Sequence, residues 1–372
     1  MNLLLHLTER CNLACHYCFA PAGSSRVMSP EVGRAAADLC LAHAARSGER
    51  AILSFFGGEP MLAFETLREV VEYASARARE QKVPCLFRMN SNGTLISDQH
   101  LAWFEQHGLR FTLSLDGDQT MHDSQRVDHA GRGSFGALEA RFDAFLGFDP
   151  ALEVSLVVTP RNLEQLASGL GYLFERGFHW LTVRPDVLAA WDRGAIAELR
   201  RQYLLVADDY LRRLRRGDEL YLNLFDDKWR SATSDAGRSG CDAGGRRLSV
   251  APGGELYPCV RWVGSAAGSP GAQLGDVWRG LDGAAVAALR AQVEAPKQPC
   301  VDCAYRERCS HDCACEQLSA TGGLQGPAPA LCEHERVLIP IADGLGNLLW
   351  REQNPAFLRK QYAGLLAPPG AT

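Results

Sequence analysis

Three cysteines stand close together near the start of the chain, in the stretch TERCNLACHYCFA at residues 8–20. Cys11 and Cys15 are separated by three residues, and Cys15 and Cys18 by two. Such short spacings let a loop curl over one face of an iron-sulfur cube, with each thiolate on a different iron. The fourth iron then has no protein ligand, and an open metal position is where a small molecule can coordinate.

A zinc ion is the alternative occupant of this loop, because zinc also takes cysteine and histidine ligands. Its fourth ligand would then come from outside the three thiols, with His16 or His6 as the candidates. The cysteine spacing alone leaves both interpretations open, and a second motif separates them.

The second motif, FFGGEP at residues 55–60, follows the next apolar run. Gly57 and Gly58 let the backbone approach a ligand closely, and Glu59 can accept hydrogen bonds from an ammonium group. One strand after a CxxxCxxC loop, this motif resembles the radical S-adenosylmethionine superfamily, which decides against zinc.

That resemblance implies a chemistry for the loop. Cys11, Cys15 and Cys18 would be the catalytic residues, because the cluster they hold binds the methionine portion of S-adenosylmethionine at its open iron. Gly57, Gly58 and Glu59 would hold the amino group. One electron from the cluster cleaves the cofactor to a 5'-deoxyadenosyl radical, which abstracts hydrogen from a substrate.

Single residues elsewhere in the chain match positions that contact the cofactor in the same superfamily. Tyr17 matches an aromatic residue that packs near adenine, and Ser114, in SLDG, matches a ribose or carboxylate contact. Leu181 occupies the place of a residue that touches adenine. The stretch HDSQRVDHAGRGSF at residues 122–135 resembles HDxxRxxxxGxGSF, in which Arg126 reaches the methionine carboxylate as a planar fork.

Two asparagines in MNSNGT carry a weaker signal. Asn90 and Asn92 lie after the third apolar run, but Asn-Gly is first of all a turn sequence. The sequence therefore predicts a turn there, with a cofactor contact as the less favoured role.

A regular scaffold must bring these loops together, and the apolar runs predict one. Stretches with helical periodicity separate the runs, for example SPEVGRAAADLCLAHAARSG and SDQHLAWFEQHG, each with a polar start and a glycine stop. Six such units predict parallel strands with crossover helices, in an α/β barrel or a doubly wound sheet. Because six units fall short of eight, we expect a partial (β/α)6 TIM barrel with its active site where the strands end. The expected strands are 2–8, 51–56, 85–90, 111–117, 153–159 and 180–185.

A second cysteine-rich region lies between residues 241 and 332. CDAGGRRLSVAPGGELYPC places Cys241 and Cys259 at the ends of a predicted hairpin, and CVDCAYRERCSHDC follows with the pattern CxxCxxxxxCxxxC. Zinc ribbons are the alternative, but a five-residue gap between the second and third thiols is unusual for them. The order resembles the SPASM domain of peptide-modifying radical enzymes, which carries two auxiliary 4Fe-4S clusters.

The resemblance implies a ligand set for each auxiliary cluster. The outer cluster would be held by Cys300, Cys303, Cys309 and Cys332, and the inner cluster by Cys241, Cys259 and Cys313. Members with a fully ligated inner cluster have one more cysteine about six residues ahead of the first, where this chain has Asp235. Either the inner cluster has an open iron, which we favour, or Cys315 is its fourth ligand.

Changes in composition along the chain indicate its domain organisation. The stretch SATSDAGRSG, rich in small polar residues, predicts a boundary, and the region beyond it has too few apolar residues to fold well without metal crosslinks. We expect a radical SAM partial barrel, a linker, a SPASM domain and a helical tail, at residues 1–216, 217–240, 241–340 and 341–372.

The charge and the cysteine count exclude several classes of protein. A net charge of -5 offers no basic excess for nucleic acid, and no apolar run is long enough for a membrane span or a signal peptide. We therefore expect a cytoplasmic protein, where thirteen cysteines indicate metal or redox sites rather than disulfides. The isolated Cys40 and Cys85 are expected to be core thiols.

The favoured function is the maturation of a ribosomally made peptide, by a thioether or carbon-carbon crosslink. An open inner cluster could bind a substrate cysteine thiolate. The expected partners are the precursor peptide and an electron donor such as flavodoxin or ferredoxin. Because the first strand starts at residue 2, with no winged-helix domain before it, leader recognition is expected from a separate protein or from the barrel and tail.

The alternative function is that of an anaerobic sulfatase-maturating enzyme, which oxidises serine or cysteine to formylglycine. Those enzymes place an aspartate base directly after the inner-cluster cysteine, whereas Val260 follows Cys259 here. A non-catalytic metal scaffold is a third possibility, which the CxxxCxxC and GGEP motifs disfavour.

Overall fold

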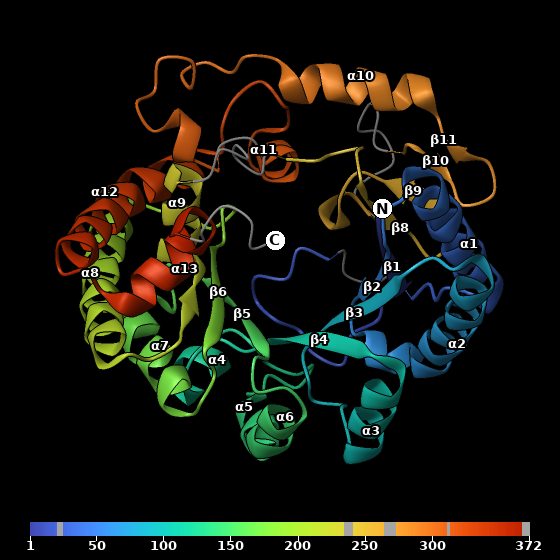
Figure 1. The fold of residues 1–372 in the computed structure, drawn as a ribbon, viewed down its shortest axis with the longest axis horizontal. Coiled ribbons are helices and arrows are strands. Elements are labelled where there is room, and N and C mark those ends of the chain that lie inside the picture. Colours follow the sequence, from blue (N-terminus) through green and yellow to red (C-terminus); the bar gives the residue numbers. More distant parts are fainter. Residues whose placement is uncertain (21–24, 234–240, 264–272, 311–312, 367–372) are drawn as a thin grey trace. The chain divides into compact units, whose positions relative to one another are not determined.

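The computed structural model describes residues 1–20, 25–233, 241–263, 273–310 and 313–366 (Figure 1). The chain forms two compact units. Unit 1 comprises Met1–Ser114, Arg126–Asp149 and Cys241–Ala295, and unit 2 comprises Leu115–Gln125, Pro150–Gly240 and Pro296–Thr372.

Four parallel strands form the centre of unit 1, in the order in which they occur along the chain. They are β1 (Asn2–Thr8), β2 (Ala51–Gly57), β3 (Cys85–Ser91) and β4 (Leu109–Ser114). The helices of this part are α1 (Pro30–Ser47), the 3-10 turn η1 (Pro60–Ala63), α2 (Phe64–Gln81), α3 (Asp98–His107), α5 (Phe135–Glu139) and α6 (Phe142–Phe148). Figure 1 shows α1, α2 and α3 along one side of these strands.

Local signals in the sequence set the bounds of these helices. Helix α1 begins where the Ser29 side chain accepts a hydrogen bond from the amide of Val32, and it ends at Gly48 with φ 67°. Helix α3 is bounded in the same way by Ser97 and Gly108. Both predicted helices are therefore present, with the caps that their sequences indicate.

The predicted hairpin extends the sheet of unit 1. Strand β8 (Arg247–Val250) pairs in parallel with β1, from Asn2↔Arg247 to Leu5↔Val250, and β9 (Glu255–Tyr257) returns antiparallel to β8. The short strands and helices that follow are η3 (Val260–Trp262), β10 (Gly275–Asp276), β11 (Gly280–Leu281) and α10 (Gly283–Glu294). The hairpin thus lies next to the strand that leads into the cysteine loop.

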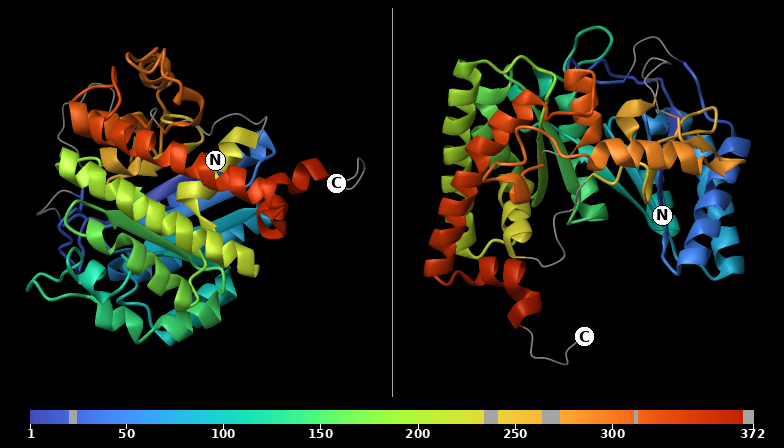
Figure 2. Two further views of the ribbon diagram at one scale, coloured as in Figure 1. Left: turned by 90° about the vertical axis from the view of Figure 1, so that its left-hand side faces the viewer. Right: turned by 90° about the horizontal axis from the view of Figure 1, so that it is seen from above.

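Unit 2 contains the parallel strands β5 (Glu153–Val158), β6 (Trp180–Pro185) and β7 (Tyr221–Leu222). Its helices are α4 (Gln119–Asp123), η2 (Leu163–Gln165), α7 (Leu166–Glu175), α8 (Arg193–Arg216), α9 (Asn223–Thr233), η4 (Arg306–Arg308), α11 (Ala314–Thr321), α12 (Pro329–Arg351) and α13 (Pro355–Leu366). Helices α8 and α12 run side by side (Figure 2).

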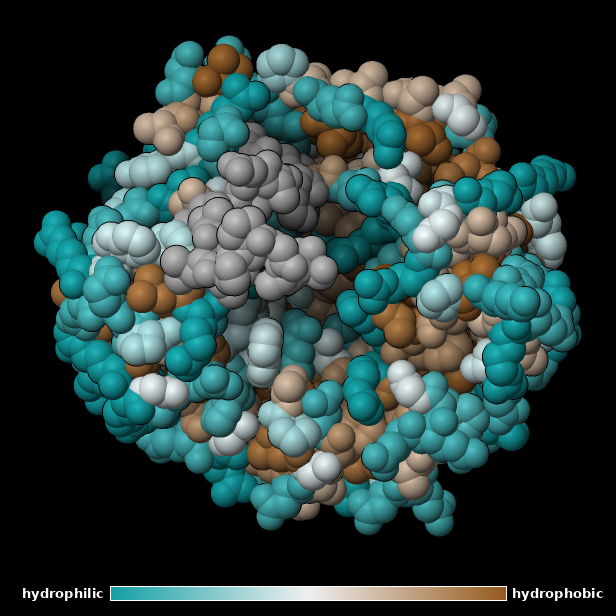
Figure 3. Space-filling view, in the orientation of Figure 1, coloured by the Kyte–Doolittle hydropathy of each residue, from teal (hydrophilic) through white to brown (hydrophobic). Residues whose placement is uncertain are grey.

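The predicted fold class is confirmed, because six parallel strands alternate with helices in the element order of a partial (β/α)6 TIM barrel. One strand prediction needs correction: β4 covers 109–114 rather than 111–117. Residues 115–117 leave the strand because Gly117 adopts φ 74°, in close packing against Gly169. Within the described ranges no helix is both long and apolar enough to cross a membrane. Hydrophilic and hydrophobic residues are interspersed over the face of the molecule drawn in Figure 3.

Candidate functional site

The cysteine loop leaves the end of β1 and carries its thiols at the surface of unit 1. Cys11 and Cys15 are half-buried and Cys18 is exposed. The Cys11 sulfur accepts hydrogen bonds from the amide of Leu13 at 3.4 Å and from Asn92 Nδ2 at 3.8 Å. Burial raises the pKa of the Cys11 thiol, whereas these two N–H donors favour the thiolate that a metal needs.

The GGEP stretch is fastened to the start of this loop by its backbone. The amide of Gly58 donates to the Thr8 carbonyl at 2.8 Å, and the amide of Glu59 donates to the Arg10 carbonyl at 2.9 Å. A Cβ atom on Gly57, whose φ is 136°, would lie 2.2 Å from the Thr8 oxygen. The close approach that these glycines permit is therefore made to the chain's own loop.

The Glu59 carboxylate is buried, with 1% of the residue exposed. One oxygen accepts hydrogen bonds from Ser91 Oγ at 2.8 Å and from the Met61 amide at 3.1 Å, and the other accepts from the Asn92 amide at 2.8 Å. Burial raises the pKa of Glu59, and these donors oppose that shift. A carboxylate offers about four acceptor sites, so about one is left for an ammonium group.

Asn92 connects β3 to the cysteine loop, a role that the sequence analysis ranked below a turn. Its side chain makes the predicted turn contact, accepting from the Thr94 amide at 3.0 Å, and it also donates to Asn12 Oδ1 at 2.9 Å. Gly93 follows with φ 77°. The available signal was the position of MNSNGT at the carboxyl end of a strand, beside the ends of β1 and β2.

The segment that begins at Arg126 covers the other side of the cysteine loop. The Val127 carbonyl accepts from the Ala14 amide at 2.7 Å, and a ring nitrogen of His129 lies 2.9 Å from the Cys11 carbonyl oxygen. The Arg126 guanidinium lies over the Tyr17 ring, 5.4 Å from its centroid. The structure therefore brings these two predicted cofactor contacts together.

The two remaining predicted cofactor contacts lie on different strands, β4 and β6. Ser114 is the half-buried last residue of β4. Leu181, on β6, is fully buried and pairs with Val154 and Leu222.

The hairpin contacts the cysteine loop through an arginine that the sequence analysis did not single out. The Arg261 guanidinium lies 4.7 Å from the centroid of Phe19, the residue after Cys18, and Phe19 stacks on Phe56. Val260 directly precedes Arg261, at the start of η3. An arginine two residues after a cysteine is too common in sequence to mark such a contact.

The predicted inner-cluster cysteines lie in the segments that flank regular elements. Cys241 precedes β8 and Cys259 follows β9 in unit 1, and Cys313 is the residue before α11 in unit 2. The sulfurs of Cys313 and the buried Cys315 are 3.3 Å apart. Asp235, named above for its position ahead of Cys241, lies outside the described residues.

Two of the four predicted outer-cluster cysteines, Cys300 and Cys332, have a raised pKa. Burial raises the pKa of Cys300, and Cys332 and Cys303 raise it further. Burial is the main cause of the raised pKa of Cys332, and Glu333 and then Cys303 raise it by smaller amounts. Cys332 also lines a cavity of about 840 Å³ together with Trp191 and Pro299. The fourth, Cys309, is buried and directly follows η4.

The thiols of Cys11, Cys15 and Cys18 are the donor type that iron-sulfur clusters take. In the described part of the chain, no three His, Cys, Asp or Glu side chains converge tightly enough to hold one metal ion. His6, a candidate for the zinc alternative, is buried against Phe56, and burial lowers its pKa to about 3. A thiol that receives N–H donors, as Cys11 does, suits a cluster ligand because those donors stabilise the thiolate.

Comparisons with known proteins show what this chain is similar to. Residues 5–134 match the Radical SAM superfamily. The serine-type anaerobic sulfatase-maturating enzyme of Klebsiella aerogenes is 26% identical over 276 residues, which cover 69% of this chain and 65% of that enzyme. The match thus spans just under two thirds of that relative's length.

Two solved structures share the fold. The structure of anSMEcpe with bound AdoMet and Cp18Cys peptide aligns with a TM-score of 0.79 at 18% identity, covering 94% of this chain and 99% of that one. Streptococcus suis SuiB bound to the precursor peptide SuiA aligns with a TM-score of 0.61 at 16% identity, covering 89% and 75%. Both likenesses extend beyond the barrel into the cysteine-rich region.

Proposed function

We propose that this chain, which carries a radical SAM domain at residues 5–134, modifies peptides by radical chemistry that starts from S-adenosylmethionine. The anchoring of the cysteine loop carries the proposal: Glu59, Asn92 and Val127 each hydrogen-bond to it. When bound, a 4Fe-4S cluster and S-adenosylmethionine supply a 5'-deoxyadenosyl radical that removes hydrogen from the substrate.

The chain's own residues would hold and orient those groups. Cys11, Cys15 and Cys18 are the proposed ligands of the first cluster, and the amides that tie the loop to GGEP keep it in place. Glu59 has about one acceptor site free for the amino group of the cofactor. Arg126, fixed over Tyr17, would present its guanidinium fork to the carboxylate. The further proposed contacts are Gly57, Gly58, Ser114 and Leu181.

A peptide substrate is supported by proteins of the same fold. The anSMEcpe structure contains the Cp18Cys peptide, and SuiB is bound to its precursor peptide SuiA. For this chain we propose a ribosomally made precursor peptide, with flavodoxin or ferredoxin as the electron donor and a separate leader-binding protein as a further partner. The proposed auxiliary clusters lie in the 241–340 SPASM domain, with the ligands named above.

The bond formed is proposed to be a thioether or carbon-carbon crosslink. Val260 directly follows Cys259, at the start of η3. Its side chain is a hydrocarbon and cannot accept a proton, so a reaction that needs a base at this position is disfavoured.

Formylglycine formation is the second candidate, because the sulfatase-maturating enzyme of Klebsiella aerogenes is 26% identical over 276 residues. That reaction would need its proton acceptor at another position of this chain. The two candidates differ in their product, since formylglycine is an aldehyde and a crosslink is not.

The first experiment is the cleavage assay. Anaerobically reconstituted protein is mixed with S-adenosylmethionine and dithionite, and 5'-deoxyadenosine is measured by chromatography. Cys15→Ala should abolish the product, because the cluster loses one of its three thiolates, and Cys85→Ala should retain it. Absence of 5'-deoxyadenosine from protein with intact clusters overturns both candidate functions.

The second experiment identifies the product on cysteine-containing candidate peptides. Loss of two hydrogens without reaction toward a hydrazide probe supports a crosslink. A product that the hydrazide traps supports formylglycine and overturns the crosslink.

A further inference from the structure

We propose that Lys228 is a positioning residue for the outer auxiliary cluster, holding the backbone before Cys309 against the helix turn that carries Cys332. The inference rests on the proposed assignment of the outer cluster to Cys300, Cys303, Cys309 and Cys332. It adds a residue that no motif indicates, since Lys228 lies outside every cysteine stretch.

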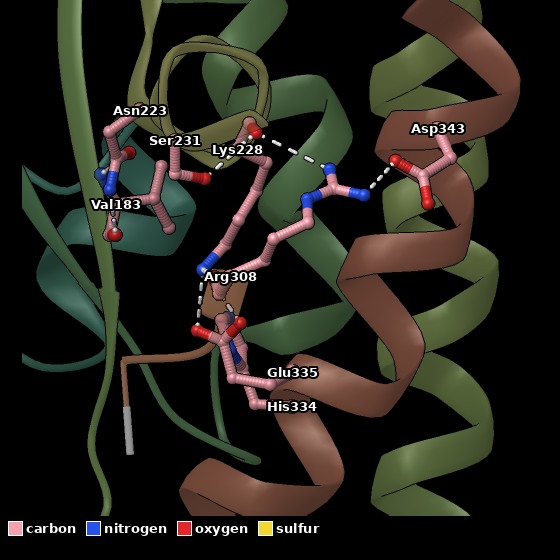
Figure 4. Close-up of polar contacts among 8 residues, drawn as sticks. All are labelled: Val183, Asn223, Lys228, Ser231, Arg308, His334, Glu335 and Asp343. Atoms are coloured by element: carbon pink, nitrogen blue, oxygen red, sulfur yellow. Dashed lines mark hydrogen bonds and ion pairs between the residues drawn. The ribbon is translucent and has the colours of Figure 1, made fainter. Parts of the chain in front are cut away.

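Lys228 projects from α9 into the interior of unit 2, where its side chain is 8% exposed (Figure 4). Its ammonium group donates to both carboxylate oxygens of Glu335, at 2.8 and 2.6 Å, and to the carbonyl oxygen of Arg308 at 3.2 Å. An ammonium group has three donors, so these contacts use all of them. Lys228 has no donor left for a substrate, which favours a positioning role.

The two acceptors of Lys228 each adjoin a predicted cluster ligand. Arg308 directly precedes Cys309, and Glu335 follows Cys332 by three residues on α12, one helical turn along the same face. One buried ammonium group therefore connects the two segments from which Cys309 and Cys332 would reach the cluster.

Arg308 reinforces the same connection from the opposite direction. Its guanidinium donates to the Lys228 carbonyl at 3.3 Å and forms an ion pair with Asp343 on α12. Lys228 and Arg308 thus exchange hydrogen bonds, side chain to backbone in both directions (Figure 4). The backbone at residue 308 is held to α9 and α12 together.

A second buried ion pair on α9 provides the matched control. Lys360 Nζ lies 2.6 Å from Asp226 Oδ1, and Asp226 is fully buried. This pair fastens α13 to α9 and contacts neither Arg308 nor Glu335 in the described structure. Loss of either pair should reduce stability, but only loss of the Lys228 pair should disturb the outer cluster.

The test compares Lys228→Met, Lys228→Arg and Lys360→Met in the full chain after anaerobic reconstitution. Iron per chain, the EPR spectrum of the reduced clusters and the melting temperature are measured. Lys228→Met should lose up to about a third of the iron of three cubane clusters and change the EPR signal. Lys228→Arg should restore both, and Lys360→Met should lower only the melting temperature.

Several results would overturn the proposal. Full iron and an unchanged EPR signal in Lys228→Met would do so, and so would equal iron losses in Lys228→Met and Lys360→Met. If Lys228→Met does not fold, Arg308→Met tests the same connection at a more exposed side chain, and an unchanged EPR signal there contradicts it.

A parallel Cys303→Ala variant separates this proposal from the cluster assignment on which it rests. Its iron content should also fall by about a third. Full iron in Cys303→Ala would mean that the outer cluster is wrongly assigned, whatever Lys228 does. If Cys303→Ala loses iron while Lys228→Met keeps its full iron content and EPR signal, only the positioning role of Lys228 is rejected, and the cluster assignment stands.

Discussion

Gly58 lies directly against the backbone of Arg10: a Cβ atom on Gly58 would stand 2.1 Å from the Arg10 carbonyl oxygen. The backbone would have to move to admit any side chain at that distance. The neighbouring amides of Gly58 and Glu59 donate to the Thr8 and Arg10 carbonyls. The start of the cysteine loop is therefore positioned by a residue that has no side chain.

Gly58→Ala should displace the cysteine loop and prevent assembly of the first cluster. We expect a loss of about a third of the total iron of three cubane clusters and no 5'-deoxyadenosine. Gly136→Ala is the control, because a Cβ atom there meets nothing within 4 Å. Normal cofactor cleavage by Gly58→Ala would show that the contact with Arg10 is not required.

Ser91→Ala should weaken the binding of S-adenosylmethionine. Ser91 Oγ donates to the buried Glu59 carboxylate at 2.8 Å, and leaving that group one donor short costs about 1–3 kcal/mol. Ser97→Ala is the matched control, since it removes the α3 cap at a cost of about 1 kcal/mol without touching Glu59. Both variants should melt earlier, and only Ser91→Ala should raise the dissociation constant measured by calorimetry.

Equal cofactor affinity in the two serine variants would contradict this role of Ser91. It would mean that Glu59 keeps its orientation through the amides of Met61 and Asn92 alone.

The barrel strands and the helix caps could be predicted because their signals are local. The bounds of β1 and β6 agree with the apolar runs, and the Ser29 and Gly48 caps of α1 stand beside the residues they terminate. The extent of β4 was predicted wrongly because Leu115 continues the apolar pattern of the strand. In the structure β4 ends at Ser114, and the backbone turns at Gly117, where it packs closely against Gly169.

Contacts between distant parts of the sequence could not be predicted. Strand β8 pairs with β1 although some 245 positions separate them, as Asn2↔Arg247 shows, and no alternation in either strand indicates its partner. Lys228 and Glu335 are 107 residues apart, and each alone resembles a solvated surface charge. Asn92 has two roles at once, and only its turn role has a sequence signature.

His6 should make the protein less stable as the pH falls below neutral. Burial lowers its pKa from 6.5 to about 3, so between these values the unfolded chain binds a proton that the folded chain does not. The contribution of His6 to the free energy of unfolding is therefore fully present above pH 6.5. Below pH 6.5 the free energy of unfolding falls by roughly 1.4 kcal/mol for each pH unit. Melting temperatures at pH 7 and 5.5 should differ less in His6→Asn than in the wild-type protein, and an equal difference would exclude His6 as the cause.

Cys315→Ser should leave the iron content unchanged if the inner cluster has an open iron. The sulfurs of Cys315 and Cys313 are 3.3 Å apart at the start of α11, close enough for a neutral Cys315 thiol to donate a hydrogen bond to a Cys313 thiolate. A serine hydroxyl can replace that donor but is a poor ligand for iron. We therefore expect Cys315→Ser to retain about twelve irons and Cys313→Ser to lose up to about four.

If the inner cluster has an open iron, a thiolate from a peptide should bind to it and change its EPR signal. Adding a cysteine-containing peptide to the reduced protein should shift the EPR signal of the inner cluster in both the wild type and Cys315→Ser. Iron loss in Cys315→Ser equal to that in Cys313→Ser would instead make Cys315 the fourth ligand. Substrate thiolate coordination at this cluster would then be excluded, and a crosslinking reaction would have to hold its thiol by other groups.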